Sequence, residues 1–387
     1  MIDHPLADEA HHLPQALALS AYAAACAVDP TAGKTEVLAA FGLQGADRGD
    51  LNDELLFGAI RLLACGRFEE SKALLLRVGL AAPEKIPAVY AITATVFKYF
   101  NAGMPIGQLV QFGIDLTLQL YQRHPHDGAA RHALLDVLLY LGAANDAERI
   151  LGQTGSAGFE QEAAELQAYR RRMAQDQSAC RLSLVLVTYE RPQMLRHTLA
   201  CARAALAESA YEIVIGVNDA NPQTRQVIED AGISKVIYNT SNTSINLYKQ
   251  VFALAQGEYI IEIDDDLHAL PHGFDRQIIA CLQARPDLGL VGHWPSGFVS
   301  ARSGQRLPQG ASNHERCEVA GLPFGIGQVW GMCAGLRRKD FLMINGFARA
   351  TLSKHSGEEP QLIRKLAVYG RLSGVIFDQG LLGIVPD

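Results

Sequence analysis

Hydrophobic residues are spaced differently in the two halves of this chain. Over residues 16–173 they recur at the three-to-four-residue spacing of amphipathic helices, and the β-branched runs that mark strands are missing. From Leu182 onwards, short runs rich in Val and Ile alternate with helix-like stretches. The pattern predicts an all-helical region followed by an α/β domain, and the polar, charged stretch at 165–177 marks the boundary. We therefore expect two domains, at 1–175 and 176–387.

Two segments of the helical half share a pattern of a hydrophobic helix, a glycine-centred turn and a second amphipathic helix. The segments are 62–70 and 138–147, and their glycines are Gly66 and Gly142. The glycines are separated by nearly two periods of a helical hairpin repeat of about 34 to 40 residues. The pattern resembles a TPR-like array, and an irregular helical bundle is the alternative that it leaves open.

The second half alternates strands and helices at the spacing of right-handed βαβ units, which implies a mainly parallel sheet with helices on both faces. In such sheets ligands bind beyond the carboxyl ends of the strands, here the turns at 188–192, 218–222 and 264–267. The predicted strands are 182–187, 213–217, 236–238 and 259–263, and the predicted helices are 193–207, one that ends near 231, and 244–256.

Three acids, Asp264, Asp265 and Asp266, directly follow the apolar strand 260–263. Carboxylates packed at the end of a buried strand repel one another, and a bound divalent cation relieves that repulsion. Mg²⁺ or Mn²⁺ suits such a site, because hard cations take oxygen ligands and are often completed by substrate phosphates. An acidic, solvated turn without a metal is the alternative.

The other two turns carry groups that suit a nucleotide. Asp219 can accept hydrogen bonds from a base or a ribose hydroxyl, although the same position suits a helix N-cap or an Asx turn. Thr188 and Tyr189 offer a hydroxyl and a ring for hydrogen bonding to, and stacking on, a nucleobase.

Together these turns resemble, in order and spacing, the nucleotide-sugar half of family-2-type glycosyltransferases with the GT-A fold. The resemblance covers about residues 181–380. It implies that Asp266 and Asp264 bind the metal, with Asp266 the more direct ligand and Asp265 at the variable middle position. The segments that carry the resemblance are 187–195, 217–221 and 257–266. The residues implied for donor-nucleotide binding are Thr188, Tyr189, Glu190, Arg191, Asp219, Lys249, Asp264 and Asp265.

The segment 330–341 is similar to the family's small-residue strand and basic helix start, which lie beside the acceptor cleft. The resemblance implies acceptor contacts from Trp330, Gly331 and Met332. Gly331 and Gly335 are expected to let the backbone approach the sugar closely.

Glu358 and Glu359 resemble the acidic pair from which the family draws its general base. Inverting transfer needs a carboxylate that removes the acceptor proton, and the resemblance implies Glu359 for this role, with Glu358 as the second choice. The alternative is structural, because Pro360 suits the first position of a helix and acids just before it are favoured by the helix dipole.

Several positions depart from the family pattern. Val187, Glu190 and Asn218 stand where the family has Pro, Asn and Asp, which leaves the donor base open. No Gln-x-x-Arg-Trp motif follows the catalytic acids, so processive polysaccharide synthesis is disfavoured. Many relatives use a further histidine as a metal ligand, for which His355 and Asp378 are the possible replacements here. Two other histidines, expected in a surface or acceptor loop, are His293 and His314.

Composition narrows the remaining classes. With 49% hydrophobic and 19% charged residues in 387, the chain is an ordinary globular protein, and its net charge of −7 gives no basic footprint for nucleic acid. The seven cysteines contain no Cys-x-x-Cys pair and do not indicate a disulfide framework. A reducing cytoplasm is therefore the expected location. No apolar run approaches the roughly 20 residues that span a bilayer.

We therefore expect a metal-dependent, inverting and non-processive glycosyltransferase that uses a nucleotide-sugar, with a UDP-sugar favoured, and Mn²⁺ or Mg²⁺. The acceptor is expected to be a protein or a glycan that the helical half recognises, because helical repeats present long concave surfaces. Two alternatives stay open: a retaining transferase on the same fold, and a helical-repeat adaptor whose transferase-like domain has lost catalysis. A nucleotidyltransferase is disfavoured because the turn at 187–192 contains no glycine.

Overall fold

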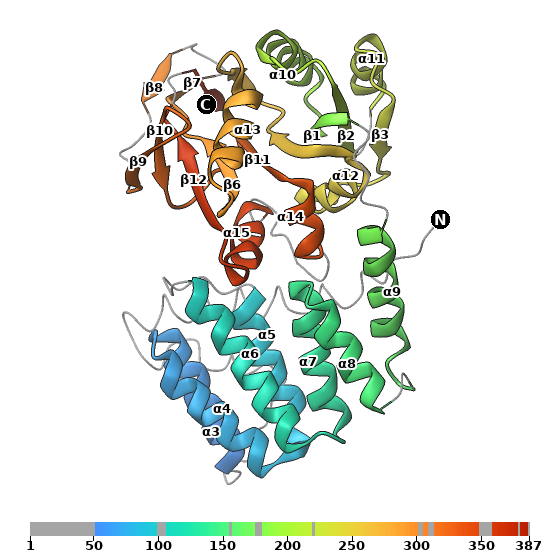
Figure 1. Ribbon diagram of the computed structural model, residues 1–387, viewed down its shortest axis with the longest axis vertical. Helices are drawn as coiled ribbons and strands as arrows, with labels where there is room; N and C mark the ends of the chain where they lie inside the picture. The colour runs from blue at the N-terminus through green and yellow to red at the C-terminus, as the bar shows by residue number, and fades with distance from the viewer. Residues whose placement is uncertain are drawn as a thin grey trace. The chain divides into compact units, whose positions relative to one another are not determined.

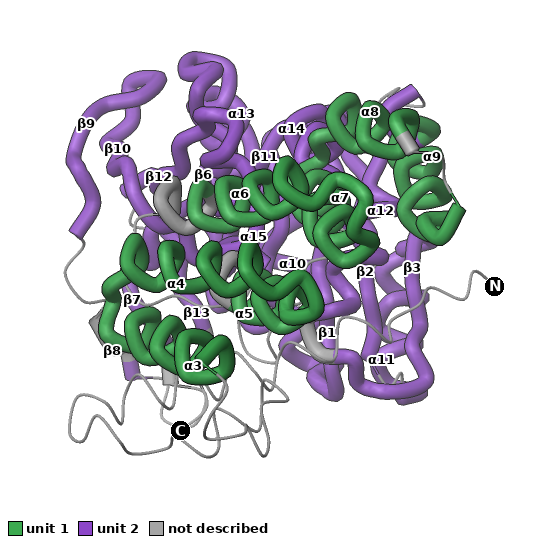
Figure 2. Tube along the Cα trace, turned by 90° about the horizontal axis from the view of Figure 1, so that it is seen from below, with its two compact units in different colours: residues 1–171, 348–351 green, residues 172–347, 352–387 purple. Residues whose placement is uncertain are grey.

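The computed structural model (Figure 1) describes residues 51–98, 106–154, 157–174, 180–218, 221–300, 305–308, 313–347, 358–377 and 380–385. Two compact units divide between Arg171 and Arg172, as the two colours of Figure 2 show. None of the described helices is long and apolar enough to cross a membrane.

The described part of the first unit is built from helices, whose core contains fully buried leucine and isoleucine side chains such as Leu56, Ile60, Leu75 and Leu116. Burying these side chains supplies most of the stability of helices this short. The helices are α3 (Leu51–Ala64), α4 (Phe68–Ala81), η2 (Pro83–Lys85), α5 (Ile86–Lys98), α6 (Ile106–Arg123), α7 (Gly128–Leu141), α8 (Ala144–Thr154) and α9 (Glu160–Ala174).

The two predicted helix–glycine–helix segments are confirmed. Gly66, between α3 and α4, has φ 72°, and Gly142, between α7 and α8, has φ 75°. These left-handed conformations favour glycine, and the Gly142 N–H donates to the carbonyl groups of Leu138 and Leu139 at the end of α7. The TPR-like interpretation stays a prediction.

The second unit is an α/β unit with a nine-stranded sheet in the order β3-β2-β1-β4-β11-β6-β12-β10-β9 and a four-stranded sheet in the order β5-β13-β7-β8. Its strands are β1 (Cys180–Tyr189), β2 (Tyr211–Asn218), β3 (Lys235–Tyr238), β4 (Gly257–Ile263), β5 (Leu267–Ala269), β6 (Leu288–His293), β7 (Gly297–Ser300), β8 (Arg306–Pro308), β9 (Glu315–Val319), β10 (Leu322–Ile326), β11 (Cys333–Arg337), β12 (Leu372–Ile376) and β13 (Leu382–Val385). Its helices are α10 (Pro192–Ala205), α11 (Pro222–Asp230), η3 (Ser244–Leu247), α12 (Tyr248–Leu254), α13 (Phe274–Ala284), α14 (Arg338–Met343) and α15 (Glu358–Val368).

The first half of the large sheet is parallel, because β1 pairs in parallel with β2 and β4, and β2 with β3. β11 then lies antiparallel between β4 and β6. This antiparallel pairing sets Cys333 opposite Ile263, and the Asp264 N–H donates to the Met332 carbonyl at 3.3 Å. The segment before β11 therefore lies directly beside the acidic turn after β4. The predicted fold class, a helical region followed by an α/β domain, is confirmed.

The two faces of β4 have different surroundings. Ile261 and Ile263 belong to the main hydrophobic core, together with Ile278 of α13. Side chains alternate along a strand, so Glu262 points to the opposite face of the sheet. That face is where Tyr248 of α12 donates a hydrogen bond to Glu262.

Two expectations for this unit are wrong. Gly335 lies within β11, where an added Cβ would come within 2.8 Å of Ile261 Cγ1, so its lack of a side chain serves strand packing and not a sugar. His293 is fully buried as the last residue of β6, with Nε2 3.3 Å from the Phe274 carbonyl oxygen, and is not in a surface loop. The Gly, Ser and Pro residues that follow it suggested a loop, whereas the strand pairing extends through His293.

Candidate active site

The acidic turn after β4 is held in place by two threonines. The Thr188 hydroxyl, at the end of β1, donates to Asp265 Oδ2 at 2.5 Å. The Thr198 hydroxyl of α10 donates to the Asp265 carbonyl at 3.0 Å and accepts from the Leu267 N–H at 3.1 Å. Both threonines are buried, so these hydrogen bonds fix the backbone of the turn in a water-poor environment.

Arg191 is the cation that faces this turn. Its guanidinium lies 2.7 Å from Asp266 Oδ2 and 3.4 Å from Asp265 Oδ1. Glu190 just before it has φ 53°, the left-handed conformation of a tight turn between β1 and α10. Arg191 neutralises only part of the negative charge, because the three aspartates lie together with the two glutamates of α15 nearby.

The carboxyl groups of the turn have raised pKa values. Burial, followed by the negative charges of Asp266 and Glu358, raises the pKa of Asp264 to about 8, against the opposing effect of Arg191. Burial raises the pKa of Asp265 to about 6, although its hydrogen bond from Thr188 acts in the opposite direction. Such shifts identify carboxylates whose charge is poorly compensated, which is a common property of functional sites.

Glu358 and Glu359 occupy the first turn of α15 and are both buried. Together with Glu262 they form a cluster in which one carboxylate oxygen from each lies within 4.8 Å of the others. Burial and the neighbouring charge of Glu358 raise the pKa of Glu359 to about 9, and burial raises the pKa of Glu262 well above its ordinary range. Three buried carboxyl groups, of which those of Glu358 and Glu359 share a hydrogen bond, are therefore packed beside the acidic turn.

Gly331 lies against this cluster. A Cβ added to Gly331 would fall 1.5 Å from Glu359 Oε1, so no side chain fits at this position without moving the glutamate. Trp330 is 39% exposed, and its ring centroid lies 5.4 Å from that of Trp294. The segment 330–332 thus connects an exposed aromatic surface to the buried glutamates.

The structure brings together the acidic turn, Thr188, Arg191, the segment 330–332 and the two glutamates of α15. Lys249 lies half-buried on α12, and Tyr189 is 37% exposed at the end of β1. Three residues expected to contribute to the site lie outside the described residues: Asp219, His355 and Asp378.

Glu262 is the member of this arrangement that the sequence interpretation missed. It lies in the middle of an apolar strand, two positions before Asp264. Alternate strand residues share a face, so an acid at this spacing belongs with Asp264 and not with the core. A buried, charged residue inside an otherwise apolar strand is the signal that could have identified it.

Carboxylates are the ligands that Mn²⁺ and Mg²⁺ prefer, so the donor set of Asp264 and Asp266 fits a hard divalent cation. Burial is the first cause of the raised pKa values of Asp264 and Asp266, and neighbouring negative charges raise the pKa of Asp264 further. A bound cation offsets both effects. The side chains present therefore suit the metal that the motif implies.

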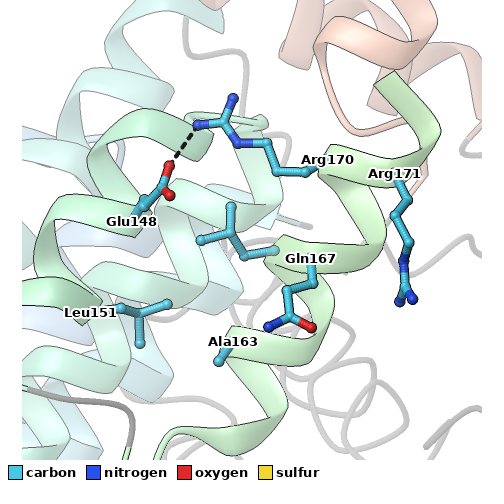
Figure 3. Close-up of a pocket in the computed structure, with 7 residues that line it drawn as sticks. Glu148, Leu151, Ala163, Gln167, Arg170 and Arg171 are labelled. Atoms are coloured by element: carbon cyan, nitrogen blue, oxygen red, sulfur yellow. Dashed lines mark hydrogen bonds and ion pairs between the residues drawn. The ribbon is translucent and has the colours of Figure 1, made fainter. Parts of the chain in front are cut away.

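The first unit carries a separate surface groove of about 390 Å³ between α8 and α9. Its floor is apolar, with Leu151, Ala163 and Leu166, and Arg170 at its edge pairs with Glu148 at 2.9 Å (Figure 3). Arg171 projects from the same helix with its guanidinium away from that pair, as Figure 3 shows. The groove offers an apolar surface with a basic edge.

Part of the second unit matches a family of glycosyltransferases. Residues 183–342 match the family model described as Glycosyl transferase family 2, so this part of the chain is a family 2 glycosyltransferase domain. The match begins within β1 and ends within α14, and it includes the acidic turn and the segment 330–332.

Solved glycosyltransferase structures resemble the chain at low sequence identity. A mannosyltransferase from Pyrobaculum calidifontis, in complex with GDP-Man and Mn²⁺, is 13% identical with a TM-score of 0.38, and the alignment covers 63% of this chain and 68% of that one. TarS of S. aureus, residues 1–349, is 14% identical with a TM-score of 0.38, with coverage of 53% and 60%. Glucosyl-3-phosphoglycerate synthase from Mycobacterium tuberculosis, with Mg²⁺ and UDP, is 12% identical with a TM-score of 0.35, with coverage of 57% and 73%. No curated protein matches the sequence.

Proposed function

We propose that this chain transfers a sugar from a nucleotide-sugar to an acceptor hydroxyl, with inversion at the anomeric carbon and release after each transfer. The supporting observation is the placement of an acidic turn at the carboxyl end of β4, beside the buried glutamates at the start of α15. In α/β sheets this edge is where ligands bind. The family 2 domain over residues 183–342 supports the reaction class.

Asp266 and Asp264 are proposed to hold Mn²⁺ or Mg²⁺, which supplies positive charge to the departing nucleotide diphosphate. Asp266 is more exposed than Asp265, the other carboxylate that pairs with Arg191, and Arg191 itself is exposed. Exchange of the guanidinium for a cation therefore requires movement of only one surface side chain. Asp265 is proposed to act mainly through its hydrogen bond with Thr188, which keeps the turn in place.

The donor nucleotide is proposed to lie over the ends of β1 and β2. The residues concerned are Thr188 and Tyr189 at the end of β1, and Glu190 and Arg191 in the turn that follows it. Asp219 comes after β2 in the sequence, and Lys249 lies on α12. The exposed ring of Tyr189 suits stacking on a base. The Arg191 guanidinium, once it separates from Asp266, suits an ion pair with a phosphate. A UDP-sugar is the favoured donor.

Glu359 is proposed as the general base, with Glu358 as the alternative. A base must be ionised to accept the acceptor proton, and burial holds the pKa of Glu359 at about 9 when no cation is nearby. A cation bound beside Glu359 lowers the pKa of this glutamate toward neutral pH. The base is therefore expected to be active only when the divalent cation is bound.

The acceptor is proposed to reach Glu359 along Trp330, Gly331 and Met332, and to be a protein or a glycan. Domains at 1–175 and 176–387 are proposed, with the helical domain recognising the acceptor, for which the groove between α8 and α9 is a suitable surface. The described cysteines are free thiols, which fits the reducing cytoplasm as the location.

The proposal is tested by thermal unfolding of the full chain with UDP, GDP, CDP or dTDP, each with and without Mn²⁺. A ligand that binds only the folded state raises the melting temperature. One nucleotide is expected to stabilise the protein strongly only when Mn²⁺ is present, and Asp266→Asn is expected to abolish that shift. Stabilisation by none of the nucleotides would leave the adaptor as the better interpretation.

Stereochemistry distinguishes the inverting reaction from its retaining alternative. NMR of the glycosylated product shows whether the anomeric configuration of the donor is inverted or kept. Product of inverted configuration, formed by the wild type and lost in Glu359→Gln, supports the proposed base.

A further inference from the structure

Glu262, Glu358 and Glu359 come from two elements that are far apart in the sequence. Glu262 lies within β4, and the other two lie in the first turn of α15. Their carboxylate oxygens, one from each side chain, lie within 4.8 Å of one another, and only 2%, 8% and 7% of the respective residues is exposed. The cluster is therefore compact and closed to bulk water.

Two oxygens of this cluster have no hydrogen-bond partner. They are Glu262 Oε1 and Glu358 Oε2, and both are buried. An isolated buried carboxylate oxygen loses its hydration without compensation, which is among the more costly arrangements in a folded protein. Buried carboxylate oxygens without a partner, in a cluster of three carboxyl groups, indicate a ligand that supplies positive charge.

Within the described part of the chain, protein side chains do not supply that charge. None of the ion pairs among these residues includes Glu262, Glu358 or Glu359. The one nearby arginine at the acidic turn, Arg191, is engaged with Asp265 and Asp266. A small cation fits the space between three carboxylates better than a longer organic group.

We propose that Glu262, Glu358 and Glu359 bind a divalent cation of their own, in addition to the one assigned to Asp264 and Asp266. Three carboxylates suit a hard ion of the Mn²⁺, Mg²⁺ or Ca²⁺ class, with water completing the coordination. Bound there, the ion ties β4 to the start of α15 and fixes the Glu359 carboxylate against Gly331. The site does not depend on the proposed transfer reaction, because all three ligands and both orphaned oxygens are features of the fold.

The test is the stoichiometry of Mn²⁺ bound to the full-length protein, measured by isothermal titration calorimetry and by elemental analysis after gel filtration. Glu262→Gln keeps the size of the side chain and removes its charge, and it leaves Asp264 and Asp266 unchanged. We expect this variant to bind one Mn²⁺ fewer per chain than the wild type. Asp266→Asn is expected to lose a different Mn²⁺, so that the double variant loses both.

Glu258→Gln is the matched control, because Glu258 is an exposed acid on the same strand, paired with Arg181. It is expected to bind as much Mn²⁺ as the wild type. Equal Mn²⁺ content in the wild type and Glu262→Gln overturns the proposal, and it means that the three carboxyl groups share protons instead of a cation. If Asp266→Asn loses one Mn²⁺ and Glu262→Gln loses none, the second cation site is overturned and the proposed transferase function is unaffected.

Folding of the variant is checked by thermal unfolding in EDTA. Glu262→Gln keeps the size of the side chain and relieves its repulsion with Glu358 and Glu359, so its melting temperature in EDTA is expected to equal or exceed that of the wild type. Addition of Mn²⁺ is expected to raise the melting temperature of Glu262→Gln by less than that of the wild type. Should Glu262→Gln fail to fold, Glu358→Gln removes a second ligand of the same site, and the same loss of one Mn²⁺ is required.

Discussion

Gly331 and Glu359 are in such close contact that a Cβ on Gly331 would fall 1.5 Å from Glu359 Oε1. The antiparallel pairing of β11 with β4 creates this contact, because it places the segment before β11 beside the acidic turn. The position of the glutamate carboxylate therefore depends on the absence of a side chain at residue 331. Gly331, which is expected from the sequence to let the backbone approach a sugar, also leaves the space that the Glu359 carboxylate occupies.

Gly331→Ala is expected to displace Glu359 and to lower kcat by at least about 10-fold, since misplacement of a catalytic group by about 1 Å costs about 10²-fold. Steady-state kinetics with the donor identified by thermal unfolding measures the effect. Gly152→Ala in α8, where an added Cβ meets nothing within 4 Å, is the matched control and is expected to keep full activity. Unchanged kcat in Gly331→Ala would argue against Glu359 as the base.

The alternation of strands and helices was predictable because each element has its own local spacing of hydrophobic residues. The predicted strand 213–217 lies within β2, and the predicted strand 259–263 lies within β4. The insertion of β11 antiparallel between β4 and β6 was not predictable from these patterns, because pairing between distant segments leaves no local period. The roles of Gly335 and His293 were misjudged for this reason, since both depend on which strands are neighbours.

The candidate site, too, has a part that local sequence predicts and a part that depends on packing. The acidic turn could be recognised from three consecutive acids after an apolar strand. The metal motif was recognised from consecutive acids, and Glu262 is separated from them by Ile263. Alternate strand residues share a face, so Glu262 could have been grouped with Asp264. Its contact with Glu358 and Glu359 needs the packing of α15 against the sheet, which no sequence spacing specifies.

Arg191 competes with a metal ion for Asp266, since its guanidinium lies 2.7 Å from the carboxylate. Arg191→Ala is therefore expected to tighten Mn²⁺ binding in the absence of nucleotide by about 3- to 10-fold, which corresponds to about 1 kcal/mol of electrostatic free energy near a protein surface. Calorimetric titration with Mn²⁺ measures the dissociation constant. The same variant is expected to bind the nucleotide more weakly, because Arg191 is proposed to contact a phosphate.

Arg196→Ala serves as the control for this experiment. Arg196 lies on α10, the helix that begins directly after Arg191, and its exposed guanidinium is 3.8 Å from Asp230. It should leave the Mn²⁺ dissociation constant unchanged. Weaker Mn²⁺ binding by Arg191→Ala would mean that the arginine organises the acids for the metal and does not compete with it.

Thr188 stabilises the acidic turn through its hydrogen bond to Asp265. Thr188→Val keeps the shape of the side chain but leaves a buried carboxylate oxygen without its donor, which costs about 1 to 3 kcal/mol. Urea unfolding is expected to show this loss, and Thr188→Ser, which restores a hydroxyl, is expected to recover most of it. A Thr188→Val protein as stable as the wild type would show that the hydroxyl contributes to the nucleotide site alone.

The pH dependence of stability reports on the same carboxyl groups. Burial raises the pKa of Glu359 from its ordinary value of 4.5 to about 9, and that of Asp264 from 3.8 to about 8. A group whose pKa is higher in the folded state stabilises the fold below its unfolded pKa, and this contribution is lost as pH rises through the folded pKa. In EDTA, stability is therefore expected to fall between about pH 5 and about pH 9, by up to about 1.4 kcal/mol per pH unit for each group.

Thermal unfolding in EDTA across this pH range, with and without saturating Mn²⁺, separates the carboxyl cluster from the rest of the chain. Glu359→Gln removes one titrating group and is expected to flatten the decline, whereas Glu258→Gln, an exposed acid on β4, is expected to leave it unchanged. Saturating Mn²⁺ is expected to flatten the wild-type decline as well, because a cation favours the ionised carboxylates that high pH produces. A decline that Mn²⁺ does not alter would mean that these buried acids titrate without binding a metal.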